Sequence, residues 1–113
     1  MSLRRALEAV PDDRMTRAVA NGVVRYLNEH RAIHVDGPRI AAMTHLDVRA
    51  VQVVLDALVV GRVLDFVSDP PGYRLLDDRV LQIEVDLFLR SSRSHGEVLQ
   101  SNVERYRRMY GGR

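Results

Sequence analysis

The sequence predicts a single, mainly α-helical domain with one small β-hairpin and a long C-terminal helix. Its 113 residues, 46% of them hydrophobic, match the size and composition of one domain. Apolar residues recur every three or four positions in several segments, which is typical of helices with one buried face. Two short β-type runs flank a stretch rich in Pro and Gly, which is typical of a hairpin.

Composition excludes several kinds of site. The chain has no cysteine, which excludes a disulfide framework, thiolate zinc sites, iron–sulfur clusters and thiol catalysis. All 17 basic residues are arginine, and the net charge of +2 is too small to indicate nucleic-acid binding by itself. The basic excess lies at the two ends, whereas residues 36–76 sum to −1 and residues 77–89 to −3. No apolar run approaches the roughly 20 residues of a membrane span, so we expect a cytoplasmic protein without membrane contact.

The N-terminal part is expected to hold a short helical extension and then a long helix. Residues 1–12 form the extension, which Pro11 interrupts. Asp12 and Asp13 offer N-cap carboxylates to a helix over about 13–30, whose apolar residues lie on one face.

Two shorter helices and the hairpin follow. Residues 32–35 alternate like a small strand, and Asp36-Gly37-Pro38 sets a turn that begins a helix of two turns. Asp47 is expected to cap a helix over 48–60, and Gly61 to end it as a C′ glycine. The two β-type runs are 62–67 and 73–76, joined by a loop at 68–72.

From Asp77 onward the apolar spacing is again helical. Asp77 or Asp78 serves as cap, and either one helix to about residue 110 or two helices broken at Gly96 satisfy the pattern. We favour one long helix. The small core formed by residues 1–76 has little surface left to cover the apolar stripe of this C-terminal segment, so we expect residues 77–113 to form a dimerisation segment. The expected dimer-interface residues are Leu81, Val85, Phe88, Leu99, Val103 and Tyr106.

With those elements placed, Met15 to Leu76 resembles the winged helix-turn-helix superfamily of bacterial and archaeal transcription regulators. The most telling stretch is LDALVVGRVLDFVSDPPGYRL, which resembles the family's passage from recognition helix through glycine and a strand to the wing. The C-terminal helix makes the chain similar to small dimeric members that pair through terminal helices. The resemblance implies a homodimeric, sequence-specific regulator of double-stranded DNA, with helix 48–60 in the major groove and wing 68–74 on the backbone.

The resemblance also implies a set of DNA contacts. Arg49 and Gln52 match the bidentate readers of guanine and adenine, and Arg74, on a hairpin stiffened by its prolines, suits a phosphate. The full set of expected contacts is Arg39, Thr44, His45, Arg49, Gln52, Arg62 and Arg74.

Some residues of the expected recognition helix suit a function other than DNA binding. Val53 and Asp56 stand on the same face as the expected readers, and the segment's negative charge suits a groove binder poorly. A winged helix used for protein contacts, or as a subunit of a larger assembly, is therefore the alternative. The sequence has no glycine-rich phosphate loop, no nucleophile paired with a base and no metal-ligand spacing among its four histidines. We expect no enzyme activity, cofactor or metal, and the question of a small-molecule effector stays open.

Overall fold

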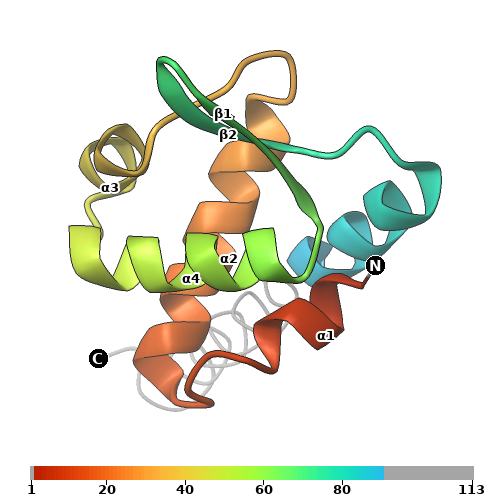
Figure 1. Ribbon diagram of the computed structural model, residues 1–113. Helices are drawn as coiled ribbons and strands as arrows, with labels where there is room; N and C mark the ends of the chain where they lie inside the picture. The colour runs from red at the N-terminus through yellow and green to blue at the C-terminus, as the bar shows by residue number, and fades with distance from the viewer. Residues whose placement is uncertain (1, 91–113) are drawn as a thin grey trace, which may run out of the picture.

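The protein is mainly helical with one small antiparallel sheet, as the sequence predicted. The structure is a computed structural model and describes residues 2–90. Residues 79–90 are also helical. The other elements are α1 (Leu3–Leu7), α2 (Arg14–Glu29), α3 (Gly37–Thr44), α4 (Val48–Val60), β1 (Leu64–Ser68) and β2 (Pro71–Leu75) (Figure 1).

Aspartates begin most of these helices, because each carboxylate satisfies a backbone N–H that has no partner inside its helix. Asp13 accepts from the N–H of Thr16 at 2.7 Å, and Asp47 accepts from that of Ala50 at 3.0 Å. Asp36 caps α3 in the same way, and Asp78 caps residues 79–90. The expected caps at 13, 47 and 78 are thus confirmed.

The end of α4 differs from the prediction. Gly61 has φ −75°, a right-handed conformation, and the left-handed residue is Arg62, with φ 62°. Glycine is required at 61 for space, because a Cβ there would lie 2.3 Å from the Cβ of Ala6. The absence of a side chain therefore lets α1 pack against the end of α4.

The hairpin loop is shorter than the sequence suggested. β1 and β2 pair antiparallel from Leu64↔Leu75 to Ser68↔Pro71, so only Asp69 and Pro70 form the turn. The strand expected at 32–35 is wrong except for Val35, which exchanges two backbone hydrogen bonds with Tyr73, at 2.9 and 2.8 Å. Three chain segments thus lie in the order Val35, β2, β1.

One hydrophobic core joins all the helices of the described chain. α4 packs against α1, α2, α3 and β1, and its buried side is formed by Val51, Val54, Leu55 and Leu58. Leu81 and Val85 belong to the same core, with exposed fractions of 2% and 0%, and Phe88 packs against it. This corrects the sequence prediction that Leu81 and Val85 form a dimer surface, because the chain buries them against itself, and it leaves Phe88 only partly exposed. Leu99, Val103 and Tyr106 lie outside the described residues.

None of the helices within residues 2–90 has both the length and the apolar character needed to cross a bilayer.

Candidate nucleic-acid interface

The connection between α3 and α4 is a tight corner that leaves its outer side chains in solvent. His45 ends α3 in the left-handed conformation, with φ 57°, and the N–H of Leu46 donates to the carbonyl of Ala41 at 3.0 Å. The Thr44 hydroxyl donates to the carbonyl of Ile40 at 2.5 Å. Thr44 is thus engaged with its own helix, whereas His45 is exposed.

The outer face of α4 is mixed in character. Arg49, Val53, Asp56 and Val60 follow one another at spacings of three or four residues, and all are exposed. The exposed fractions of Val53 and Val60 are 50% and 80%. This face therefore offers one arginine, two apolar side chains and one carboxylate.

Gln52 does not share the open surface with Arg49. Its amide nitrogen donates to Asp56 Oδ1 at 2.8 Å and to the Tyr73 hydroxyl at 3.0 Å. Its amide oxygen lies so close to Gly37 that a Cβ there would be 2.9 Å away. Gln52 is held between α3 and β2, which corrects the expectation that it projects freely beside Arg49.

Arg74 lies in the middle of β2 and not at the hairpin tip. It is opposite Asp65, with 3.8 Å between its Nη2 and Asp65 Oδ2. His34 Nε2 lies 3.0 Å from the same oxygen. The exposed tip, Ser68 to Pro71, carries Asp69 and no basic residue. Arg74 thus lies in a strand, as the sequence predicted, with a carboxylate of the neighbouring strand beside it, and its contact with a phosphate stays a prediction.

Four of the predicted contacts remain, and all four are exposed: Arg39, His45, Arg49 and Arg62. Arg39 lies in the first turn of α3 and Arg49 in the first turn of α4, and neither forms an ion pair within residues 2–90. Arg62 follows the opposite end of α4, roughly 20 Å along the helix axis from Arg49. Arg39, His45 and Arg49 thus belong to α3, its C-cap and the first turn of α4, whereas Arg62 follows the other end of α4.

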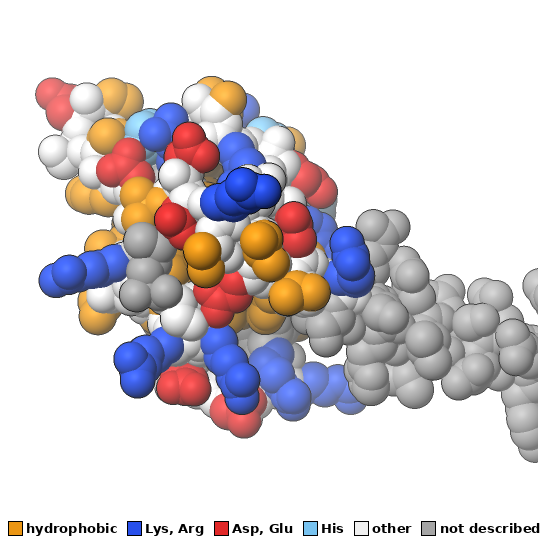
Figure 2. All heavy atoms as spheres, turned by 90° about the vertical axis from the view of Figure 1, so that its right-hand side faces the viewer, with side chains coloured by type: hydrophobic (Ala, Val, Ile, Leu, Met, Phe, Trp, Pro, Cys, Tyr) orange, Lys and Arg blue, Asp and Glu red, His pale blue; other side chains and the backbone are white. Residues whose placement is uncertain are grey.

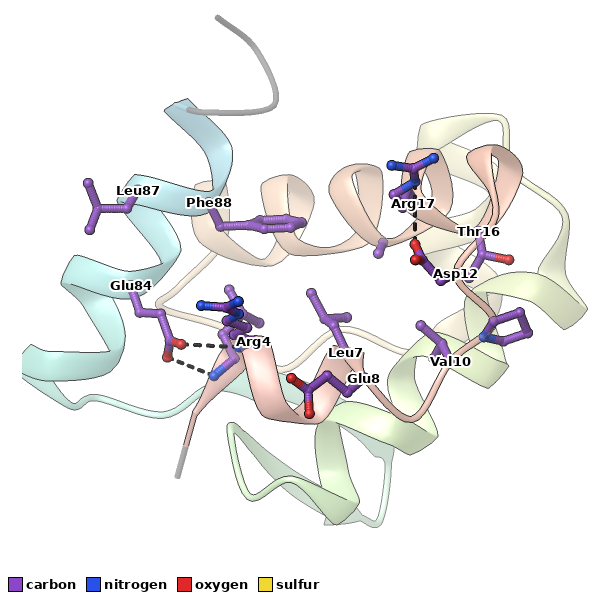
Figure 3. Close-up of a pocket in the computed structure, with 13 residues that line it drawn as sticks. Arg4, Leu7, Glu8, Val10, Asp12, Thr16, Arg17, Glu84, Leu87 and Phe88 are labelled. Carbon is purple, nitrogen blue, oxygen red and sulfur yellow. Dashed lines mark hydrogen bonds and ion pairs between the residues drawn. The ribbon is translucent and has the colours of Figure 1, made fainter. Parts of the chain in front are cut away.

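A groove that the sequence did not predict lies between α1, the start of α2 and residues 79–90. It has a volume of about 840 Å³, and Figure 3 shows Leu7 and Phe88 pointing into it, while Leu87 at its edge points away. On the rim of the groove, Arg17 Nε lies 3.7 Å from Asp12 Oδ1. The apolar spacing of residues 3–10 indicated a helix, but nothing in the sequence showed which element would cover it.

Glu84 joins the two walls of this groove. Its carboxylate accepts from the N–H groups of Leu3, at 2.7 Å, and Arg4, at 3.1 Å, and from the Ser2 hydroxyl, at 2.9 Å. Burial opposes ionisation of this carboxyl, but those hydrogen bonds outweigh it and hold the pKa of Glu84 below its usual value. Glu84 therefore acts as a cap for α1 supplied from a distant helix.

No group of three His, Asp or Glu side chains within residues 2–90 is arranged to hold a metal ion. Comparison of the chain with protein-family models, with curated proteins and with solved structures found no significant match.

Proposed function

We propose that this protein is a winged helix-turn-helix regulator that binds double-stranded DNA through the α3–α4 corner. The observation that carries the proposal is the order of elements: α2, Val35, α3, α4, β1 and β2, with Val35 and the hairpin in one small sheet. This is the order expected of the superfamily that the sequence resembles. In that arrangement α4 is the recognition helix.

Arg49 is the proposed base reader. It is exposed in the first turn of α4, the part of a recognition helix that reaches base edges, and its guanidinium matches guanine N7 and O6. Arg39 and His45 are proposed to contact phosphates beside it. Gln52 reads adenine only if it gives up its hydrogen bonds to Asp56 and Tyr73, so its contribution is expected to be smaller.

The surface charge sets the expected strength of binding. In the corner, Arg39 and Arg49 are balanced by the capping carboxylates of Asp36 and Asp47. The hairpin tip adds the negative charge of Asp69, and the charge of Arg74 is paired with that of Asp65. With so few phosphates neutralised, we expect weak non-specific binding and a shallow dependence on salt.

The test is selection of a DNA site from a random library, followed by titration by fluorescence anisotropy at two salt concentrations. Arg49→Ala is expected to weaken binding to the selected site by about 5- to 150-fold, the value of one bidentate base contact. Arg62→Ala is the control, because it removes an exposed arginine that lies just beyond the far end of α4. Failure to select any sequence, or equal losses for the two variants, would contradict the proposal.

A role in protein contacts is the second candidate, and a specific observation favours it. Phe66, in β1, is 46% exposed and stacks in a tilted arrangement with Tyr73 on the sheet, and Val53 and Val60 are exposed on α4. Val53→Arg separates the two functions. It is expected to strengthen non-specific DNA binding if this face lies on DNA, and to leave it unchanged if the face binds protein.

A further inference from the structure

The helix formed by residues 79–90 is apolar on two sides. Leu81 and Val85 face the core, whereas Val80, Ile83 and Leu87 are 72%, 55% and 58% exposed. We call the latter three residues the outer stripe. Figure 2 shows the face of the molecule on which this helix lies, where hydrophobic side chains gather among acidic and basic ones. A helix that is apolar on opposite sides is normally covered on both.

We propose that the outer stripe packs against the outer stripe of a second copy of this chain, with the two helices antiparallel. The three residues follow the alternating spacing of a coiled-coil seam. A two-fold axis near Ile83 brings the two Ile83 side chains together and places Val80 of each copy opposite Leu87 of the other. The same surface then serves both partners, as a symmetric dimer requires.

The charges beside the outer stripe favour a second copy of the chain as the partner and an antiparallel arrangement of the two helices. Arg79, Asp86 and Arg90 lie along one edge of the stripe and form no ion pair within residues 2–90. In the antiparallel arrangement Arg79 of one copy lies opposite Asp86 of the other, and this pair occurs twice. In a parallel pair this edge faces the other edge of the partner helix, so Arg79 and Asp86 do not meet. The pair Arg79 and Asp86 is therefore complementary only in the antiparallel arrangement.

The surroundings of the stripe do not oppose this pairing. On the side of Asp86 and Arg90, a shallow crevice also contains Arg25 and Glu29 of α2, whose charges cancel. On the other side, the carboxylate of Glu84 is occupied by the N-terminal backbone of α1. Arg90 is then the charge of this edge that the pairing leaves without a partner, and it follows Leu87 at the end of the seam.

The interface is expected to be weak. Three side chains per copy bury less than the roughly 1,200–2,000 Å² of a standard interface, so a Kd in the micromolar range or above is expected from the seam. Leu87 also borders the groove beside α1, which Leu7 lines as well. The pairing goes beyond the proposed DNA contact, because it uses a different helix and a different face.

The first experiment measures the oligomeric state of the full chain by sedimentation equilibrium. Ile83→Glu puts two like charges at the axis and is expected to raise the dimer Kd at least tenfold. Gln82→Glu adds the same charge one position away, off the stripe, and is expected to change Kd less than twofold. Circular dichroism confirms that both variants are folded. A monomeric wild-type chain, or a dimer that Ile83→Glu leaves intact, would overturn the proposal.

The second experiment tests the direction of the helices. Arg79→Glu and Asp86→Arg are each expected to weaken the dimer, whereas the double variant, or a mixture of the two single variants, restores it. A parallel dimer gives neither effect, since this edge of the two copies then lies on opposite sides of the seam and Arg79 does not meet Asp86. DNA binding is measured separately with Arg49→Ala, which leaves the outer stripe unchanged, so the failure of one proposal is distinguishable from the failure of the other.

Discussion

The carboxylate of Glu84 accepts a hydrogen bond from the backbone N–H of Leu3 at 2.7 Å, across 81 positions of the sequence. A five-residue helix such as α1 has too few internal hydrogen bonds to persist alone. Glu84 and Ser2 satisfy the N–H groups at its beginning, and Ala6 meets Gly61 near its end. α1 therefore depends on tertiary contacts at both ends.

Glu84→Gln is expected to destabilise the fold by about 1 kcal/mol at pH 7, because it weakens charge-assisted hydrogen bonds. The pKa of Glu84 is lowered in the folded protein, so its carboxylate stabilises the fold above its ordinary value of 4.5. That stability is lost as the pH falls through the lowered folded pKa, so wild type and variant should converge in acid. Urea unfolding at pH 7 and at pH 3 measures the difference, with Glu8→Gln at the exposed C-cap of α1 as control. A pH-independent difference would contradict this account.

Gly61→Ala is expected to destabilise the fold by about 1–3 kcal/mol, because the new Cβ overlaps Ala6. Adding Ala6→Gly should recover part of the loss, since it removes the other atom of the clash. The measurement is a double-mutant cycle by thermal or urea unfolding. Gly22→Ala is the control, since its Cβ meets only the end of the Leu46 side chain. Additive effects of the two changes would show that they act independently.

Arg74→Ala is expected to cost less than about 1 kcal/mol of stability, because its ion pair with Asp65 is partly exposed and long. It should leave the salt dependence of DNA binding unchanged, since Arg74 lies away from the hairpin tip. Arg39→Ala should reduce that slope by about one charge. Anisotropy titrations across several salt concentrations compare the two, and the reverse ranking would return Arg74 to the DNA surface.

Tyr73→Phe is expected to cost about 0.5–1.5 kcal/mol, because it removes the hydroxyl that accepts from Gln52 while keeping the ring against Phe66. Gln52 then keeps only its bond to Asp56. If Gln52 reads DNA, the variant should bind the selected site at least as tightly as the wild type despite its lower stability. Weaker binding with an unchanged sequence preference would show that Gln52 serves the fold alone.

The helices were largely predictable, because their limits are set locally. Asp13 and Asp47 cap the helices that follow them, and the apolar spacing marks their buried sides. The strand at 32–35 was not predictable in the same way, since only the bond of Val35 to Tyr73, far along the chain, decides which residues pair.

The sequence analysis was less successful in predicting which face of the helix formed by residues 79–90 is buried. Residues 79–90 carry two apolar sides, and periodicity identifies both without indicating which one meets the core. The sequence prediction placed Leu81 and Val85 outside, whereas packing against the core selects them and leaves Val80, Ile83 and Leu87 in solvent. The partners of Gln52 and Arg74 were hidden for the same reason, because Tyr73 and Asp65 reach them only after the hairpin folds back.

The contact between Gly61 and Ala6 gives α1 the position of a spacer. One end of α1 contacts the C-terminal end of α4. At the other end, the N–H of Leu3 donates to Glu84 of the helix that carries the outer stripe. In the proposed dimer, α1 and the packing of Leu81 and Val85 on the core together set how far the α4 helices of the two copies stand apart. In the proposed complex with DNA, that separation has to match a helical turn, about 34 Å or a multiple of it. Gly61→Ala would then change the spacing of the two copies without changing any proposed DNA contact.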